Sequence, residues 1–251
     1  MIDLQHTRLL GHRGARFEAL ENTRFGFEYA NTLQARGLAG IEFDVQLTAD
    51  GHLVVFHDDT LVRLCGLQAR IDQLTWLEVQ RHLQSGHPII TLAQLAELLS
   101  APAPLSPRFV PRFSHIELEI KTHSRTNHRR IIHALEHDFR TTALASLPIT
   151  LTCFDTELLL QLQRHPILRH IPRGLLVRHP KALAGAPNTA LQLGCVQLGI
   201  HYPLLTAEVI RQCHRYGLPV SAWTVNDLSV IRQMVAWQVD VIITDIPAQV
   251  L

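Results

Sequence analysis

Cysteine is scarce in this sequence. Only four cysteines occur among the 251 residues, and no two of them are separated by just two residues. This spacing excludes a C-x-x-C motif of the kind used for metal binding or redox chemistry. Free thiols in a reducing cytosol are the simplest explanation of the four, which are Cys65, Cys153, Cys195 and Cys213.

Long apolar runs and strong charge of either sign are also absent. No apolar stretch approaches the roughly 18 residues that a membrane-spanning helix needs, and residues 1–8 lack the charged-then-apolar pattern of a signal peptide. The formal net charge is +1, and the short basic run at residues 127–130 fits a solvated helix start. We therefore expect a cytoplasmic protein that neither inserts into a membrane nor binds nucleic acid. The sequence leaves open whether it is a monomer or a dimer.

Charged side chains are instead concentrated beside strand-like runs. Apolar and acidic residues alternate in residues 41–45, so Glu42 and Asp44 point to the same face of a predicted strand. Two carboxylates aimed together repel each other unless a cation lies between them, and oxygen ligands favour Mg²⁺ or Ca²⁺ over zinc. If these two carboxylates stood alone, a strand with one solvated face would explain them. Here the flanking segments also carry histidines and an arginine of the kind found in active sites. We predict that Glu42 and Asp44 bind a divalent metal.

The dipeptide Asp50-Gly51 lies between two strand-like runs and predicts a hairpin. Residues 53–56 should then fold back antiparallel on residues 42–47, which places His57 roughly opposite Asp44. The hairpin would deliver this imidazole to the edge of the predicted metal site. His52, at the turn itself, is expected to be a solvated loop histidine.

The tripeptide His12-Arg13-Gly14 ends an apolar run and predicts a strand that stops in a turn permitted by glycine. The guanidinium of Arg13 is a planar fork of donors that suits phosphate oxygens, and histidine titrates near neutral pH. Glu21 directly precedes the predicted helix start at residues 22–23. We expect Glu21 to orient His12 or the metal site without binding the metal itself. The alternative is that Glu21 is an acid at a helix start, stabilised by the helix dipole.

Residues 115–121 form a further strand-like run that carries charge. Glu117, Glu119 and Lys121 share one face of it, and such groups are costly in a sheet covered on both sides unless they are paired or bind a ligand. Glu119, near the strand end, is the predicted third metal ligand, and Lys121 a second phosphate-binding cation. Glu117 lies deeper and is expected to form a structural salt bridge.

Together, these segments contain what metal-assisted cleavage of a phosphodiester requires. Carboxylates can hold a divalent cation, the two histidines can move protons, and fixed cations can bind the phosphate. The sequence therefore predicts an enzyme.

Eight strand-like runs alternate with helical patterns and predict an α/β fold, a (β/α)8 TIM barrel. A doubly wound open sheet is the alternative, but the sequence has no glycine-rich nucleotide loop to favour it. The candidate site residues lie at or just after the carboxyl ends of their strands, where barrel enzymes place their chemistry. The predicted strands are residues 9–12, 40–45, 115–120, 149–154, 174–177, 195–199, 220–225 and 241–244. Helices are predicted over residues 24–36, 92–99, 129–138, 155–165, 180–192, 206–216 and 228–237.

We expect residues 1–251 to form one barrel domain with a small insertion at about residues 58–90, after the second strand and its hairpin. A helix over residues 75–83 of this insertion would belong to a small cap over the barrel mouth. The proline-rich residues 101–111 predict an extended connection. Trp223 ends the seventh strand, where its ring would pack against a glycerol or choline group at the mouth. A core tryptophan in the barrel wall is the alternative.

The ordered motifs resemble the glycerophosphodiester phosphodiesterase family from Leu9 to Pro247, and the runs at residues 172–176 and 193–196 resemble its cytosolic bacterial branch. The sequence departs from the family pattern at Cys153, where serine is usual. The matching blocks are His12-Arg13-Gly14, Glu21-Asn22-Thr23, Glu42-Phe43-Asp44, Asp50-Gly51, His57-Asp58, Glu119-Ile120-Lys121, Cys153-Phe154, Trp223-Thr224-Val225-Asn226 and Ile243-Thr244-Asp245-Ile246-Pro247.

The resemblance implies hydrolysis of deacylated phospholipids to sn-glycerol 3-phosphate and an alcohol. His12 and His57 would act as a general acid and base pair. The carboxylate metal site would hold Mg²⁺ or Ca²⁺, with Arg13 and Lys121 sharing the phosphate charge.

Three alternatives stay open. The family's similarity to phosphoinositide-specific phospholipase C implies that a substrate hydroxyl attacks first to give a cyclic phosphate, whereas direct attack by water is the other route. A related barrel phosphodiesterase acting on a phospholipid or lysophospholipid is the alternative enzyme. A phosphate-binding barrel without turnover is the non-enzyme alternative.

Overall fold

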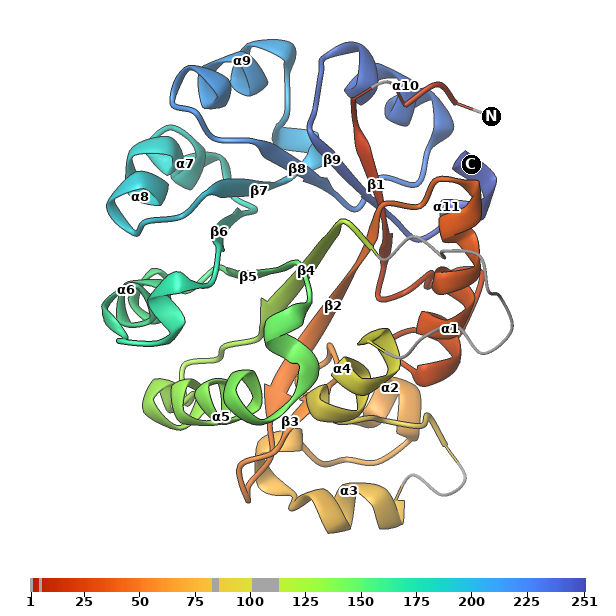
Figure 1. The fold of residues 1–251 in the computed structure, drawn as a ribbon, viewed down its shortest axis with the longest axis vertical. Helices are drawn as coiled ribbons and strands as arrows, with labels where there is room; N and C mark the ends of the chain where they lie inside the picture. The colour runs from red at the N-terminus through yellow and green to blue at the C-terminus, as the bar shows by residue number, and fades with distance from the viewer. Residues whose placement is uncertain (1, 5, 83–85, 101–112) are drawn as a thin grey trace.

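Parallel strands pair around a closed ring in this protein. The computed structural model describes residues 2–4, 6–82, 86–100 and 113–251. Strand β1 (Arg8–His12) pairs in parallel with both β2 (Gly40–Leu47) and β9 (Val241–Thr244), and this double pairing closes the sheet. The predicted eight-stranded parallel TIM barrel is therefore confirmed (Figure 1). The remaining barrel strands are β4 (His115–Ile120), β5 (Ile149–Cys153), β6 (Arg173–Val177), β7 (Gln197–His201) and β8 (Val220–Trp223).

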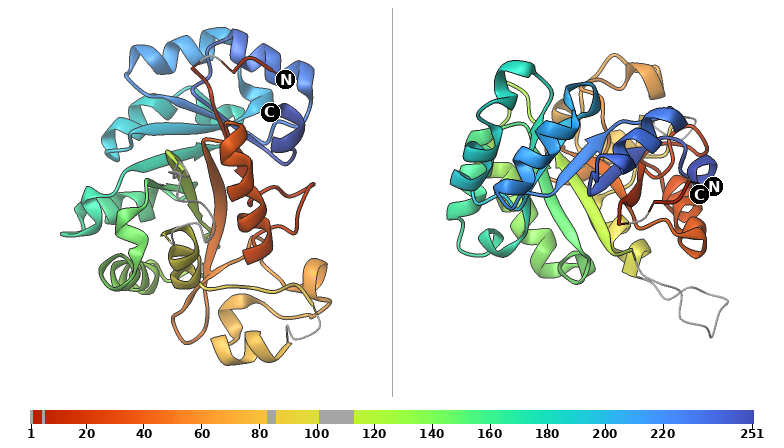
Figure 2. Two further views of the ribbon diagram at one scale, coloured as in Figure 1. Left: turned by 45° about the vertical axis from the view of Figure 1, so that its right-hand side comes forward. Right: turned by 90° about the horizontal axis from the view of Figure 1, so that it is seen from above.

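Helices surround the strands, so the barrel strands are buried on both faces, as their long apolar runs require (Figure 2). Side chains at several helix starts accept hydrogen bonds from the first free backbone N–H groups; Asn127, Asp155 and Asp227 are examples. The helices are α1 (Arg24–Thr32), α4 (Leu92–Ser100), α5 (His128–Thr141), α6 (Thr156–Arg164), α7 (Pro180–Leu183), α8 (Ala186–Gln192), α9 (Ala207–Arg215), α10 (Leu228–Ala236) and α11 (Pro247–Val250). Short 3₁₀ turns are η1 (Leu33–Arg36), η3 (Ala143–Ser146), η4 (Leu168–His170) and η5 (Tyr202–Leu204).

The structure corrects several predicted element boundaries. Strand β8 ends at Trp223, two residues earlier than predicted, and the helix expected over residues 24–36 is α-helical only to Thr32 and continues as the 3₁₀ turn η1. The helix expected over residues 180–192 is divided into α7 and α8 at Ala184 and Gly185, because Pro187 lacks the N–H that a continuous helix would use and its ring crowds the preceding turn. Strand β7, predicted as the sixth barrel strand at residues 195–199, begins at Gln197, two residues later than predicted, because its parallel register pairs Gln197 with Gly174 of β6.

The predicted hairpin is confirmed, because β3 (Leu53–Val55) pairs antiparallel with β2. After it, the insertion contains α2 (Val62–Cys65), η2 (Ile71–Gln73) and α3 (Trp76–His82), and α3 lies at the foot of Figure 1. This segment has a small core of its own, made by Val54, Phe56, Leu61, Ile71, Val79 and Ile89. Leu83, the last residue of the predicted cap helix, and the proline-rich connection at residues 101–111 lie outside the described residues.

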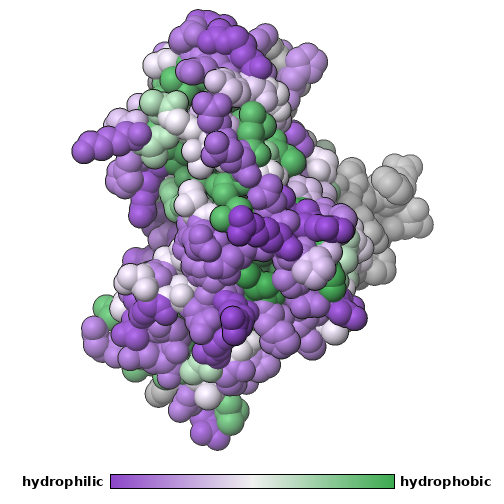
Figure 3. Space-filling view, turned by 90° about the vertical axis from the view of Figure 1, so that its left-hand side faces the viewer, coloured by the Kyte–Doolittle hydropathy of each residue, from purple (hydrophilic) through white to green (hydrophobic). Residues whose placement is uncertain are grey.

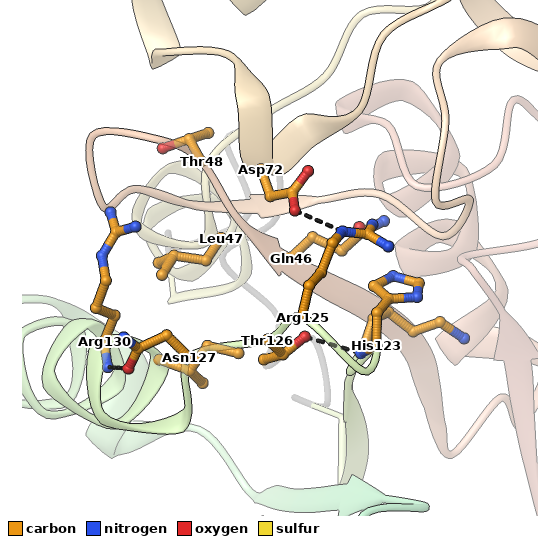
Figure 4. A pocket seen from close by; sticks show the side chains of 11 residues that line it. Gln46, Leu47, Thr48, Asp72, His123, Arg125, Thr126, Asn127 and Arg130 are labelled. Carbon is orange, nitrogen blue, oxygen red and sulfur yellow. Dashed lines mark hydrogen bonds and ion pairs between the residues drawn. The ribbon is translucent and has the colours of Figure 1, made fainter.

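Ion pairs attach the insertion to the rim of the barrel. Arg125, in the loop after β4, donates through Nε to Asp72 of the insertion at 2.7 Å, and it also pairs with Asp59. Figure 4 shows Arg125 reaching Asp72 across a small pocket, beside the start of α5. The insertion is thus held against the carboxyl ends of β2 and β4.

None of the helices in the described ranges is both long enough and apolar enough to cross a bilayer. On the face drawn in Figure 3, hydrophobic residues form small groups separated by hydrophilic ones.

Candidate active site

Three carboxylates meet at the carboxyl end of two neighbouring strands. Glu42 and Asp44 come from β2, and the parallel register aligns Asp44 with Glu119 of β4. Each residue offers one oxygen such that all three oxygens lie within 4.8 Å of one another. Because Glu42 and Asp44 are buried and Glu119 is nearly so, water screens their mutual repulsion poorly.

The titration behaviour of this triad follows from its burial and crowding. Burial, followed by the charges of Asp44 and Glu119, raises the pKa of Glu42 well above its usual range. Burial also raises the pKa of Glu119. Burial alone would raise the pKa of Asp44, but Lys121 and Arg13 outweigh it and lower that pKa. A buried set of hard oxygen donors that resists full ionisation fits a divalent cation such as Mg²⁺ or Ca²⁺.

The loop after β1 turns Arg13 onto these carboxylates. Arg13 has a φ of 51° and Gly14 a φ of 92°, both in the left-handed region. Gly11 is required for the same turn, because a Cβ there would lie 1.8 Å from the carbonyl oxygen of Gly14. The backbone N–H of Arg13 donates to Glu42 Oε2 at 3.3 Å, and its Nε lies 3.2 Å from Asp44 Oδ2.

Glu21 contacts arginines, and the expected contact with His12 is not the one observed. Its carboxylate accepts from Nη1 of Arg13 at 2.7 Å and from both Nη1 and Nη2 of Arg63 in the insertion, at 2.9 and 2.8 Å. Burial alone would raise the pKa of Glu21, but the hydrogen bonds and charges of Arg63 and Arg13 lower it strongly. Glu21 therefore stays ionised and fixes the guanidinium of Arg13.

His12 is oriented by a residue from the other end of the chain. Its Nδ1 lies 2.6 Å from Asp245 Oδ1, and Asp245 in turn accepts from Asn226 Nδ2 at 2.6 Å. With Nδ1 engaged, Nε2 is left to face the site, 3.7 Å from Glu42 Oε2. Burial lowers the pKa of His12, and the hydrogen bond to Asp245 opposes this effect. Asp245 belongs to the last of the sequence motifs, but the motif by itself does not predict its contact with His12.

His57 has a similar arrangement on the opposite side of the triad. Its Nδ1 lies 2.8 Å from Asp58 Oδ1, and Asp58 is held by Arg63 Nε at 2.6 Å. The hairpin motif predicts that His57 lies roughly opposite Asp44. In the structure Phe56, one residue earlier, lies there and donates its N–H to the Asp44 carbonyl, so the predicted register was off by one position. Burial lowers the pKa of His57, and the charge of Asp44 opposes this effect.

Lys121 completes the cationic part of the site. Its Nζ lies 2.7 Å from Glu119 Oε1 and 3.4 Å from Asp44 Oδ1. Burial alone would lower the pKa of Lys121, but Asp44 and Glu119 outweigh it and raise that pKa, so the ammonium stays charged.

Glu117 and Trp223 line a cavity that is also lined by His12, Glu42 and Glu119. Glu117 is 1% exposed and lies 3.3 Å from His115 Nε2, which agrees with a structural pair within β4. Trp223 packs edge-on to Phe154, with ring centroids 5.7 Å apart, and lies beside His201 at 5.1 Å. It is only half-buried and borders the cavity, so it is not enclosed in the barrel wall.

Comparisons with known proteins agree with this geometry. The model of the glycerophosphoryl diester phosphodiesterase family matches residues 12–249. A glycerophosphodiester phosphodiesterase of Caldanaerobacter subterraneus subsp. tengcongensis is 28% identical over 253 residues, which cover 96% of this chain and 95% of the relative.

Two solved structures share the fold. The crystal structure of a glycerophosphodiester phosphodiesterase from Thermotoga maritima matches with a TM-score of 0.75 and 25% identity, covering 98% of this chain and 97% of that one. A phosphodiesterase from Oleispira antarctica, solved with the product sn-glycerol-3-phosphate, matches with a TM-score of 0.81 and 23% identity, covering 97% and 94% of the two chains.

Proposed function

The chain belongs to the glycerophosphoryl diester phosphodiesterase family and is a phosphodiester hydrolase, and we propose a reaction for it and a role for each residue of the site. The proposed reaction converts a small glycerophosphodiester to sn-glycerol 3-phosphate and an alcohol. The observation that carries the proposal is the triad of Glu42, Asp44 and Glu119 together with two histidines, each fixed through Nδ1 by a carboxylate: His12 lies beside Glu42, and His57 interacts with the charge of Asp44. The product bound in the Oleispira antarctica phosphodiesterase supports the identity of the product.

Glu42, Asp44 and Glu119 would hold the divalent cation, Mg²⁺ or Ca²⁺. Their donor atoms are all hard carboxylate oxygens, and burial together with the charges of Asp44 and Glu119 raises the pKa of Glu42. When bound, such a cation draws electron density from a phosphate oxygen and offsets the charge that develops as the diester is cleaved.

His12 and His57 would exchange protons at Nε2 with the two oxygens that change their bonds to phosphorus. One imidazole accepts a proton from the attacking group, either water or a substrate hydroxyl, while the other donates a proton to the leaving oxygen. If the substrate hydroxyl attacks, a cyclic phosphate forms, and water then opens it to give sn-glycerol 3-phosphate. Asp245 and Asp58 keep each Nδ1 protonated, which leaves Nε2 as the atom that accepts or delivers a proton. Both pKa values are lowered by burial, so neither imidazole is locked in its charged form.

Arg13 and Lys121 would share the remaining phosphate charge. Arg13 is oriented by Glu21, while Lys121 borders the open groove beside His57. Trp223 would pack against the glycerol portion, because its ring borders the inner cavity next to His12. A cytosolic location is part of the proposal and is favoured by the four free thiols.

A product assay tests the proposal. Purified protein is incubated with glycerophosphocholine, glycerophosphoethanolamine and glycerophosphoglycerol, and released sn-glycerol 3-phosphate is measured after EDTA treatment and after adding back Mg²⁺ or Ca²⁺. We expect metal-dependent release from at least one of these esters. If no ester released sn-glycerol 3-phosphate under any metal condition, the proposed reaction would be wrong.

A further inference from the structure

An open groove of about 730 Å³ leads away from the site on the His57 side. Its walls come from the loops that follow β3, β4, β5 and β6. His57, Glu119 and Lys121 border one end, so the groove begins where the substrate phosphate would bind. Phe154 and Arg178 stand on the wall formed by β5 and β6.

The guanidinium of Arg178 lies over the ring of Phe154, 4.7 Å from its centroid. Stacking of this kind holds the planar group in one orientation and leaves its N–H edge free for a ligand. Arg178 is the exposed residue directly after β6, so its donors face solvent at the groove.

Within the described part of the chain, Arg178 is the one charged residue of this groove that has no oppositely charged partner. The other ionisable lining residues form ion pairs: His57 with Asp58, Asp58 with Arg63, Asp59 with Arg125 and His123, Glu119 with Lys121, and Asp155 with His128. The acids of the groove are thus already compensated, whereas the charge of Arg178 is not.

The part of the chain that contains Arg178 has few acidic residues. No aspartate or glutamate occurs between Glu157 and Glu208, a segment that spans most of α6 and all of β6, α7, α8 and β7. The same segment contains Arg164, Arg169, Arg173, Arg178 and Lys181. No acid from residues 158–207 competes with a ligand for Arg178, and Asp155 of the groove is paired with His128.

We propose that Arg178 and Phe154 form a head-group subsite that selects glycerophosphodiesters whose alcohol portion carries a carboxylate. This inference rests on the proposed function and adds the substrate class. A guanidinium fork matches a carboxylate in shape and charge. A quaternary ammonium is disfavoured, because Arg178 already covers the ring face of Phe154 on which such a group would stack.

Two esters that differ only in a carboxylate test the subsite: sn-glycero-3-phosphoserine and sn-glycero-3-phosphoethanolamine. We expect the native enzyme to have a kcat/KM about 10-fold higher for the serine ester, the size expected of one partly solvated charge-assisted hydrogen bond. Arg178→Gln should reduce this ratio to about 1, and Arg178→Lys should keep part of it. Lys181→Gln removes a positive charge from the same acid-free segment without touching the groove, and it should keep the full ratio.

The outcomes separate the subsite from the reaction itself. Hydrolysis of both esters with a ratio that Arg178→Gln leaves unchanged would overturn the subsite while keeping the proposed function. A native preference for the ethanolamine ester would also overturn the subsite. If the native enzyme hydrolysed neither ester but released sn-glycerol 3-phosphate from glycerophosphocholine or glycerophosphoglycerol, the subsite would be wrong and the proposed function would stand. Release from none of the four esters, with Mg²⁺ and Ca²⁺ each supplied, would overturn the proposed function itself.

Discussion

His12 Nδ1 lies 2.6 Å from Asp245 Oδ1, although 233 residues separate the two in sequence. The contact exists because the barrel closes between its first and last strands, with Gly11 of β1 paired to Thr244 of β9. Asn226 holds the second oxygen of Asp245 at 2.6 Å, so this carboxylate cannot rotate away. Closure of the sheet therefore also sets the orientation of His12.

Asp245→Asn should lower kcat by roughly 10²-fold or more. The amide of asparagine can donate to Nδ1 and so stabilise the tautomer of His12 that is protonated on Nε2, and in that tautomer Nε2 cannot accept a proton. The fold should be preserved, since the two side chains have nearly the same shape. Asp240→Asn is the matched control, because Asp240 pairs with His214 at 2.8 Å on the surface. A kcat for Asp245→Asn within a few-fold of the parent would contradict the role of Asp245.

The two histidines can be tested directly. His12→Ala and His57→Ala should each lower kcat by roughly 10²-fold to 10⁴-fold, because each removes a proton-transfer group. Thermal unfolding should change little, and the parent should have a bell-shaped pH profile. His52→Ala, at the exposed turn of the hairpin, serves as a control with parental activity. A variant of His12 or His57 that kept parental kcat would show that its role was misassigned.

The barrel and the clustering of the three carboxylates were predictable from the pattern of strands. Alternation along β2 and β4 puts Glu42, Asp44 and Glu119 on one side, and parallel pairing then aligns Asp44 with Glu119. The first step is local, and the second follows once the alternation of strands and helices predicts that β2 and β4 are parallel neighbours in a barrel. The histidine that follows β3 was placed one position away from its true register, since a hairpin count depends on how the turn itself is built.

The supporting contacts could not be predicted in the same way. The partner of His12 depends on the stagger at which β9 meets β1, and the partner of Glu21 depends on where the insertion places Arg63. These are consequences of tertiary packing between distant segments, which periodicity does not contain. The free charge of Arg178 is visible only once the ion pairs of its neighbours are known.

Removal of the metal should abolish activity without unfolding the protein. We expect EDTA to reduce turnover to background and Mg²⁺ or Ca²⁺ to restore it better than a thiophilic ion. The circular dichroism spectrum should persist, because Arg13 and Lys121 still pair with the carboxylates. Glu42→Gln should bind the metal more weakly while keeping the fold. Full activity after exhaustive chelation would rule out a catalytic metal.

Thiol reactivity should separate one cysteine from the other three. Burial raises the pKa of Cys153 to about 12 and that of both Cys195 and Cys213 to about 11. A raised pKa lowers the thiolate fraction at any given pH, so at pH 8 these thiols should stay unmodified by DTNB. Cys65 is partly exposed and should react first. All four should react in guanidinium chloride, and rapid labelling of more than one native thiol at pH 8 would contradict the buried placement.

The physical state of the substrate distinguishes a soluble diester from a membrane lipid. Of the two proposed phosphate-binding residues, Arg13 is 6% exposed, and the side chain of Lys121 is 16% exposed. The substrate phosphate must therefore enter the cavity to reach them, which a phosphate held at the surface of a bilayer could not do. We therefore expect turnover of glycerophosphoethanolamine in solution and negligible turnover of the matching diacyl lipid in vesicles. Lys121→Ala should raise KM for the soluble diester more than it changes thermal stability, because its proposed partner is the substrate phosphate. Arg24→Ala, which removes an exposed ion pair with Glu28, is a control for nonspecific charge loss. Faster hydrolysis of the vesicle lipid than of the deacylated compound, measured side by side, would favour a phospholipase-like enzyme over the one proposed.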